Sequence, residues 1–311
     1  MLIDAVTLAQ ATARTGTYEH NGFPIHYIES GAVRTDDATD QDAPTVVFIH
    51  GYTLAGKSFV LNMKHIWDQH PEVPILAPDY RGHGETPRVA PNECTTDAAA
   101  DDVAAVIQGR ASTGRLILVG HSLGGSVALD LLRRYPEIRE RTVGLVLVAT
   151  AMKPFGSKGI PRLLNLNLVN KLHDAAEKAP KPIQRVRRQL TGLMAPILAG
   201  FVFHRKTSDS EIVRFHARMI NTTPLASLVG FMHDLAKHSE VAAAPAIKDI
   251  PGSVITGDSD TFCPPAHSKF IKEHWPAGEY HEYEDVGHMV ILEAPEYVDQ
   301  AIDRLLKRVG F

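Results

Sequence analysis

The sequence predicts an α/β fold in which a mostly parallel central sheet carries helices on both faces. Two observations lead to this fold class, and the composition is compatible with it. Short apolar runs of strand length alternate with longer segments of helical periodicity along most of the 311 residues. Residues 143–148 form a continuous apolar run, which is typical of a strand covered on both faces. The composition, 44% hydrophobic and 22% charged, is ordinary for a soluble globular protein.

The predicted elements follow one another in chain order. The expected strands are residues 24–28, 46–49, 74–77, 116–119, 143–148, 253–256 and 280–283. A helix is expected over residues 95–109, with Thr95 or Thr96 available as its N-terminal cap. A closing helix is expected over residues 295–309.

Between the strand at 116–119 and the next helix lies the pentapeptide Gly120-His121-Ser122-Leu123-Gly124. This is a G-x-S-x-G motif. A chain that turns sharply from strand to helix crowds its own backbone, and glycines on either side of the serine relieve that crowding. The pattern predicts that Ser122 stands at a tight apex, where its hydroxyl suits a nucleophile.

Charge and cysteine content exclude several classes of protein. A net charge of −4 indicates no affinity for nucleic acid. Two distant cysteines, Cys94 and Cys263, do not form a disulfide framework and fit a reducing compartment. The N-terminal residues do not resemble a secretory signal, and no apolar run approaches the roughly 20 residues of a spanning helix. We therefore expect a soluble, cytoplasmic protein.

A serine hydroxyl needs a neighbouring base, and the sequence offers sixteen histidines. His121 adjoins Ser122, and adjacent side chains diverge, so it is a poor base. His50 and His83 lie beside glycines in loops, where packing explains them. His288 follows the predicted strand 280–283 and lies on a loop at a strand end, where catalytic side chains of open sheets gather. We expect His288 to be the base.

The base needs an orienting acid. Asp258 and Asp260 both follow the predicted strand 253–256, and their spacing alone does not choose between them. Glu284 and Asp285 are too close to His288 in sequence for a favourable turn.

Other polar side chains carry simpler interpretations. His65 and His70 are not spaced by four residues and are expected at the surface. Cys263 is expected to be a small loop residue. Because the sequence contains no H-E-x-x-H motif or Cys/His cluster, no metal site is expected.

Five motifs together show that the chain resembles an α/β-hydrolase over most of its length. They are Gly120 to Gly124, His50-Gly51-Tyr52-Thr53, Asp79-Tyr80-Arg81-Gly82-His83-Gly84, the acid loop from Gly257 to Pro264, and Gly287-His288 with Glu293 and Pro295. The order Ser, Asp, His is also that of the family. One departure is Gly84-Glu85-Thr86-Pro87, where many relatives carry a serine shortly after the glycine.

The resemblance implies roles for individual residues. Ser122 would be the nucleophile, His288 the base and Asp260 the acid, with Asp258 as the fallback. The backbone N–H groups of Leu123 and Tyr52 would form the oxyanion hole. No cofactor and no metal ion are implied.

The resemblance also implies that the chain is divided into a core and an inserted cap. Residues 1–151 and 238–311 would form the hydrolase core, and residues 152–237 an inserted helical cap. Residues 151–206 carry eleven Lys and Arg against two acidic residues, a net charge of +9, so the remainder sums to −13. This basic segment, which includes Arg185, Arg187 and Arg188, is either a solvated face or a surface for weak association with an anionic membrane.

The expected activity is hydrolysis of a carboxylic ester, of a small molecule or a lipid, through an acyl-serine intermediate. The Leu-rich cap favours an apolar acyl group. A serine nucleophile disfavours haloalkane dehalogenase and epoxide hydrolase chemistry. The same residues also serve a cofactor-free perhydrolase, a C–C bond hydrolase or a lyase. A ligand-binding protein without turnover is the alternative from another class.

Overall fold

A computed structural model describes residues 2, 6–7, 12–31, 43–154, 203–204 and 210–311. Their centre is one eight-stranded sheet with the strand order β1-β2-β4-β3-β5-β6-β7-β8. The strands are β1 (Arg14–His20), β2 (Phe23–Ser30), β3 (Thr45–Ile49), β4 (Ile75–Pro78), β5 (Leu116–His121), β6 (Thr142–Val148), β7 (Gly252–Gly257) and β8 (Gly278–Tyr283). All seven predicted strands are present.

The sheet is mostly parallel, as predicted. β3 to β8 all run parallel to one another, whereas β1 pairs with β2 and β2 with β4 in the antiparallel sense. β1 was not predicted from the sequence. It is an edge strand whose residues alternate between exposed and partly buried, so it lacks the apolar run by which the other strands were recognised.

The longer helices are α2 (Val60–Gln69), α3 (Thr96–Arg110), α4 (Leu123–Arg134), α8 (Ser210–Thr222), α9 (Leu225–Leu235), α11 (Pro265–His274) and α13 (Pro295–Arg308). Shorter ones are α5 (Pro136–Arg141), α10 (Ala244–Ile247), α12 (Val290–Glu293), η1 (Gly56–Phe59), η2 (Pro91–Glu93) and η5 (Val241–Ala243). Thr95 is the cap of α3, since its hydroxyl accepts the Ala98 amide at 3.1 Å.

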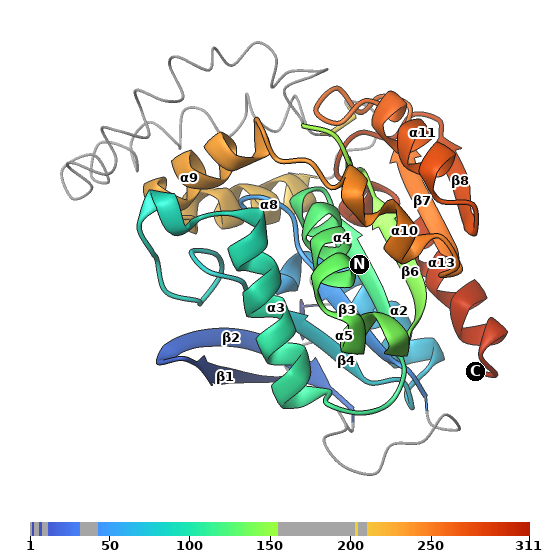
Figure 1. The fold of residues 1–311 in the computed structure, drawn as a ribbon, viewed down its shortest axis with the longest axis horizontal. Helices are drawn as coiled ribbons and strands as arrows, with labels where there is room; N and C mark the ends of the chain where they lie inside the picture. The colour runs from blue at the N-terminus through green and yellow to red at the C-terminus, as the bar shows by residue number, and fades with distance from the viewer. Residues whose placement is uncertain (1, 3–5, 8–11, 32–42, 155–202, 205–209) are drawn as a thin grey trace.

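Helices cover both faces of the sheet, as the fold class requires (Figure 1). An apolar core lies between the sheet and the helices on each face. In β5, Leu116 and Leu118 pack into the core that holds α3 and α4. Ile117 and Val119 point the other way, into the core that holds α2 and α13. This alternation explains why the central strands are apolar at every position.

The carboxyl ends of the parallel strands carry the candidate residues. Ser122 follows β5, Asp260 follows β7 and His288 follows β8. α8 and α9 connect to this edge, because the Thr223 hydroxyl donates to the Thr53 carbonyl and the Tyr52 hydroxyl donates to the Leu228 carbonyl at 2.6 Å.

α8 and α9 belong to the predicted cap, residues 152–237. The basic run with Arg185, Arg187 and Arg188 lies outside the described residues. The division into core and cap stays a prediction. Within the described ranges, no helix is both long and apolar enough to cross a membrane. Both cysteines are free and buried.

Asp79, in the loop after β4, organises the backbone beside the site. One carboxylate oxygen accepts the Gly56 amide at 2.7 Å, and the other accepts the Glu85 amide at 3.1 Å and contacts His26 Nδ1 at 2.9 Å. These partners keep the Asp79 pKa below its usual range although burial opposes them. The neighbouring Thr86 hydroxyl bonds to the Asp79 carbonyl, so this turn closes without the serine that many relatives carry.

Asp79→Asn is expected to lower the free energy of unfolding by about 3 kcal/mol, because an amide nitrogen would face backbone donors in a buried site. Urea unfolding measures this loss. Asp68→Asn, which removes an exposed carboxylate paired with Lys64, is the matched control and should change stability by less than about 1 kcal/mol. Equal effects of the two variants would contradict the structural role of Asp79.

Candidate active site

The turn between β5 and α4 forces Ser122 into an unusual backbone conformation. Its φ is 55° and its ψ is −121°, a region that L-residues rarely occupy. A Cβ on Gly120 would lie 2.5 Å from the Gly124 carbonyl oxygen, and one on Gly124 would lie 2.0 Å from the Ile49 carbonyl oxygen. Only glycine fits at either position, so the predicted reason for both glycines is confirmed.

Hydrogen bonds hold this turn in place. The Ser122 amide donates to the Val148 carbonyl at 2.9 Å. The Ser122 carbonyl accepts the Thr150 hydroxyl at 2.6 Å and the Gly125 amide at 2.9 Å. The backbone strain at Ser122 is therefore compensated by the end of β6, the neighbouring strand.

The structure brings Ser122, His288 and Asp260 together although they are far apart in sequence. Ser122 Oγ lies 3.0 Å from His288 Nε2, and His288 Nδ1 lies 2.7 Å from Asp260 Oδ2. The His288 and Asp260 side chains are 5% and 0% exposed. A hydroxyl, an imidazole and a carboxylate thus form one buried chain of hydrogen bonds.

Asp260, and not Asp258, is the carboxylate that contacts His288. Its Oδ1 accepts the amides of Phe262 at 2.9 Å and Cys263 at 2.7 Å, which leaves Oδ2 for the imidazole. Asp258 is exposed on the same loop. Cys263 contributes its amide, as expected of a small loop residue.

A second carboxylate, Glu293, shapes the loop that carries His288. It accepts the amides of Gly287 at 3.3 Å, Met289 at 3.1 Å and His204 at 2.7 Å. His204 lies within the predicted cap. The glutamate of the G-H-x-x-x-x-E motif therefore fixes the backbone on both sides of His288 and binds the backbone of His204.

His121 forms a hydrogen bond with the backbone of His288. Its Nε2 lies 3.0 Å from the His288 carbonyl oxygen, and a carbonyl only accepts, so Nε2 carries the hydrogen. Burial, and to a smaller extent the charge of a protonated His288, lowers the pKa of His121 to about 3. His121 is neutral near pH 7 and positions the backbone of His288.

The two expected oxyanion amides lie in adjoining segments. Leu123 is the first residue of α4, and the first amides of a helix have no partner inside it and stand at its positive end. Tyr52 lies in the loop after β3. This loop and the start of α4 are in direct contact, because a Cβ on Gly124 would meet the His50 carbonyl oxygen at 2.4 Å.

Buried histidines hold the loop that carries Tyr52. The His50 ring stacks on Tyr80 at a centroid distance of 4.0 Å. His83 Nε2 accepts the Thr53 amide at 3.2 Å. Burial lowers the pKa of both histidines, that of His83 to about 3. The sequence interpretation of His50 and His83 as loop-packing residues agrees with these contacts.

Sequence reasoning missed His216, on α8. Its ring meets Phe203 edge to face at 5.1 Å, and it is 3% exposed. Burial, and to a smaller extent the charge of a protonated His288, lowers its pKa to about 3, so His216 lies near the site. His216 belongs to no motif, and only the packing of the helices brings it there.

Two groups of side chains in the described part of the chain could hold a metal ion, and both lie outside the hydrogen-bond chain of Ser122. They are His65 with His70 and Asp303, and Asp97 with His238 and Glu240. The interpretation of His65 and His70 as simple surface residues missed their shared contact with Asp303.

A strand–turn–helix serine with buried histidine and aspartate partners, at the carboxyl edge of a doubly covered sheet, defines a class of hydrolase. The family model "Alpha/beta hydrolase family" matches residues 46–301. The chain belongs to the alpha/beta hydrolase family.

Three comparisons show what this chain is similar to. Lipase LipV of Mycobacterium tuberculosis is 37% identical over 113 residues, 36% of this chain and 40% of that lipase. The sn-1-specific diacylglycerol lipase ABHD11 of Mus musculus is 23% identical over 272 residues, 86% of this chain and 82% of the lipase. A thermophilic esterase from Thermogutta terrifontis superposes with a TM-score of 0.73 at 23% identity, covering 96% of this chain and 100% of the esterase.

Asp260→Asn is expected to lower kcat for an activated ester by about 10⁴-fold, because an asparagine amide would favour the wrong tautomer of His288. Asp258→Asn is the matched control on the same loop. It removes an exposed carboxylate and should lower kcat by less than about tenfold. Steady-state kinetics of both variants measure the ranking, and the reverse order would show that the acid is assigned to the wrong aspartate.

Stability is expected to fall as the pH falls from 6.5 toward 3. His83, His121 and His216 have folded-state pKa values of about 3, against 6.5 for the unfolded chain. Within this window the unfolded state binds more protons, so each buried histidine costs up to about 1.4 kcal/mol per pH unit. Urea unfolding at pH 7 and pH 5.5 measures the slope.

His83→Gln keeps a side chain that can accept the Thr53 amide and removes one titrating group. The slope of stability against pH should therefore decrease by up to about 1.4 kcal/mol per pH unit in this variant. An unchanged slope would mean that His83 does not stay neutral in the folded protein.

Proposed function

We propose that this protein is a serine hydrolase that cleaves carboxylic esters through an acyl-serine intermediate. The observation that carries the proposal is the buried hydrogen-bond chain in which Ser122 Oγ lies 3.0 Å from His288 Nε2 and His288 Nδ1 lies 2.7 Å from Asp260. The esterase and lipase names of the relatives support ester hydrolysis in general.

In the first half of the proposed reaction, Ser122 Oγ attacks the ester carbonyl carbon while its proton moves to His288 Nε2. Asp260 stabilises the resulting imidazolium through Nδ1. The tetrahedral intermediate then collapses, the bond to the alcohol oxygen breaks, and His288 returns the proton to the leaving alcohol. The acyl group stays on Ser122.

In the second half, a water molecule takes the place of the alcohol. His288 accepts a proton from the water, the hydroxide oxygen attacks the acyl carbon, and the bond to Ser122 Oγ breaks. Ser122 recovers its proton from His288. The carboxylic acid leaves and the enzyme returns to its starting state.

The amides of Leu123 and Tyr52 are proposed to bind the oxyanion of both tetrahedral intermediates. Each such donor contributes on the order of 3 kcal/mol to the transition state. Tyr52 is anchored through its hydroxyl to Leu228 at 2.6 Å, and Leu123 is fixed by the packing of α4 on β3. Both amide groups are therefore held in position before substrate binds.

The proposed substrate is a small-molecule or lipid ester with an apolar acyl group. α9, which reaches the Tyr52 loop, is largely apolar, with Val229 and Phe231 buried. The Phe262 ring lies 4.9 Å from the His288 ring. The apolar Phe262 ring beside His288 and the apolar helix at the Tyr52 loop favour an apolar acyl chain over a charged one.

Ser122→Ala is expected to abolish turnover of a series of p-nitrophenyl esters, with kcat reduced by about 10⁴-fold or more, while the fold is retained. The same variant should lose covalent labelling by a fluorophosphonate probe, because that probe reacts with an activated serine. Ser126→Ala, one helical turn further along α4, is the matched control and should keep both activities.

The two readouts separate the proposal from its alternatives. Absence of labelling in the wild-type protein would favour a ligand-binding protein. Labelling at Ser122 without turnover of any ester would favour the perhydrolase, C–C hydrolase or lyase chemistries. Turnover in Ser122→Ala within tenfold of the wild type would contradict the nucleophile assignment.

A further inference from the structure

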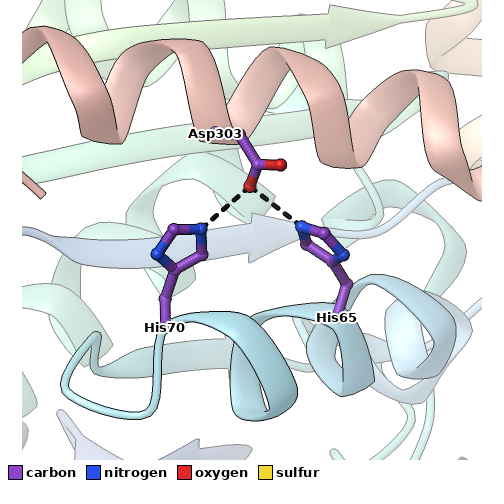
Figure 2. Close-up of side chains that lie close together, drawn as sticks. All are labelled: His65, His70 and Asp303. Carbon is purple, nitrogen blue, oxygen red and sulfur yellow. Dashed lines mark hydrogen bonds and ion pairs between the residues drawn. The ribbon is translucent and has the colours of Figure 1, made fainter.

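A cluster of two imidazoles and one carboxylate joins α2 to α13 (Figure 2). These two helices pack on the face of the sheet opposite to α4. His65 lies on α2, and His70 is the residue that ends this helix. Asp303 lies on α13. Sequence spacing did not suggest this cluster, because His70 has left the helix with φ −137° and so turns back toward the side of His65.

Both imidazoles point at the same carboxylate oxygen. His65 Nε2 lies 2.9 Å and His70 Nε2 lies 3.0 Å from Asp303 Oδ1. The three ligand atoms all lie within 4.8 Å of one another. The side chains are 25%, 19% and 39% exposed, so the cluster is open to solvent on one side.

We propose that His65, His70 and Asp303 form a binding site for a divalent transition-metal ion such as Zn²⁺. Two imidazole nitrogens and one carboxylate oxygen are a donor set typical of Zn²⁺, and water supplies the fourth position. Hard ions such as Mg²⁺ and Ca²⁺ prefer oxygen ligands and fit this set poorly.

The distances suit such an ion after a small adjustment. Zn²⁺ binds nitrogen and oxygen at about 2.0–2.2 Å, so two ligands of a tetrahedral ion stand about 3.4 Å apart. The nitrogen–oxygen distances of 2.9 and 3.0 Å must therefore lengthen by a few tenths of an ångström. The partly exposed Asp303 carboxylate can make this shift by rotating its side chain.

A second carboxylate lies on the far side of His65. Asp299 Oδ2 is 3.9 Å from His65 Nδ1, the nitrogen that faces away from Asp303, and this distance is too long for a hydrogen bond. Asp299 is itself held by Asn62 Nδ2 at 2.7 Å. The negative charge of Asp299 near the cluster favours binding of a cation there.

The other candidate cluster is less suitable for a metal ion. Glu240, which it requires, is already paired with the Arg133 guanidinium at 3.1 Å and with His238 Nε2 at 2.7 Å. Glu240 is also nearly fully buried. An ion there would have to compete with a permanent cation, so His238 serves as a control.

A bound ion would link two helices that each follow a segment of the site. α2 follows the loop that carries Tyr52, and α13 follows the segment that carries His288. Because the site is formed only in the folded chain, the ion stabilises the folded state. This inference concerns stability and does not depend on the proposed ester hydrolysis.

The test is titration of the metal-free protein with Zn²⁺, read by equilibrium dialysis and thermal unfolding, and with Co²⁺, read by visible absorption. We expect one Zn²⁺ per chain that competes with Co²⁺. At a free Zn²⁺ concentration of about 100 times Kd, the folding equilibrium should shift about 100-fold and Tm should rise by about 5 °C.

His70→Gln and Asp303→Asn should each weaken Zn²⁺ binding by about 100-fold and abolish the Co²⁺ absorption bands, whereas His238→Gln should leave both unchanged. Because each variant is compared with and without metal, a change in its own stability does not affect the result. Absence of saturable Zn²⁺ binding, binding retained in His70→Gln and Asp303→Asn, or binding lost in His238→Gln would overturn the proposal.

Discussion

The close packing of the Ser122 turn against the ends of β3 and β6 is the constraint on which the rest of the structure depends. Ser122 holds a left-handed backbone conformation only because Gly120 and Gly124 let the chain pass within contact of neighbouring backbone. The same contact brings the first amide of α4 beside the loop of Tyr52 and aims the serine hydroxyl at the edge where β7 and β8 end. A larger residue at either glycine would push the Ser122 turn and the start of α4 away from the Tyr52 loop.

The polar groups around this turn are arranged so that few of them carry a charge near pH 7. His83, His121 and His216 are neutral because of burial, and they serve as hydrogen-bond partners or packing surfaces. Asp260, in contrast, is held by two backbone amides and His288. A low-polarity surrounding strengthens the electrostatic effect of this hydrogen-bonded carboxylate on His288.

Much of the fold and the members of the site could be predicted from the sequence, because they depend on local patterns. Apolar runs predicted the buried strands, and the glycines around Ser122 predicted the turn. The choice of Asp260 over Asp258 needed the family pattern, since both follow the same strand. Three features depend on packing between distant segments, which no local sequence pattern indicates. They are the edge strand β1, the position of His216 near the site, and the cluster at Asp303.

The proposed mechanism requires that Ser122 becomes covalently acylated during turnover. The most direct measurement uses a p-nitrophenyl carbamate, whose carbamoyl-enzyme hydrolyses slowly, followed by peptide mass mapping. We expect release of one p-nitrophenolate per chain and a single carbamoyl group on the peptide that contains Ser122. A carbamoyl group on another residue, or no carbamoylation in a protein that still hydrolyses esters, would contradict it.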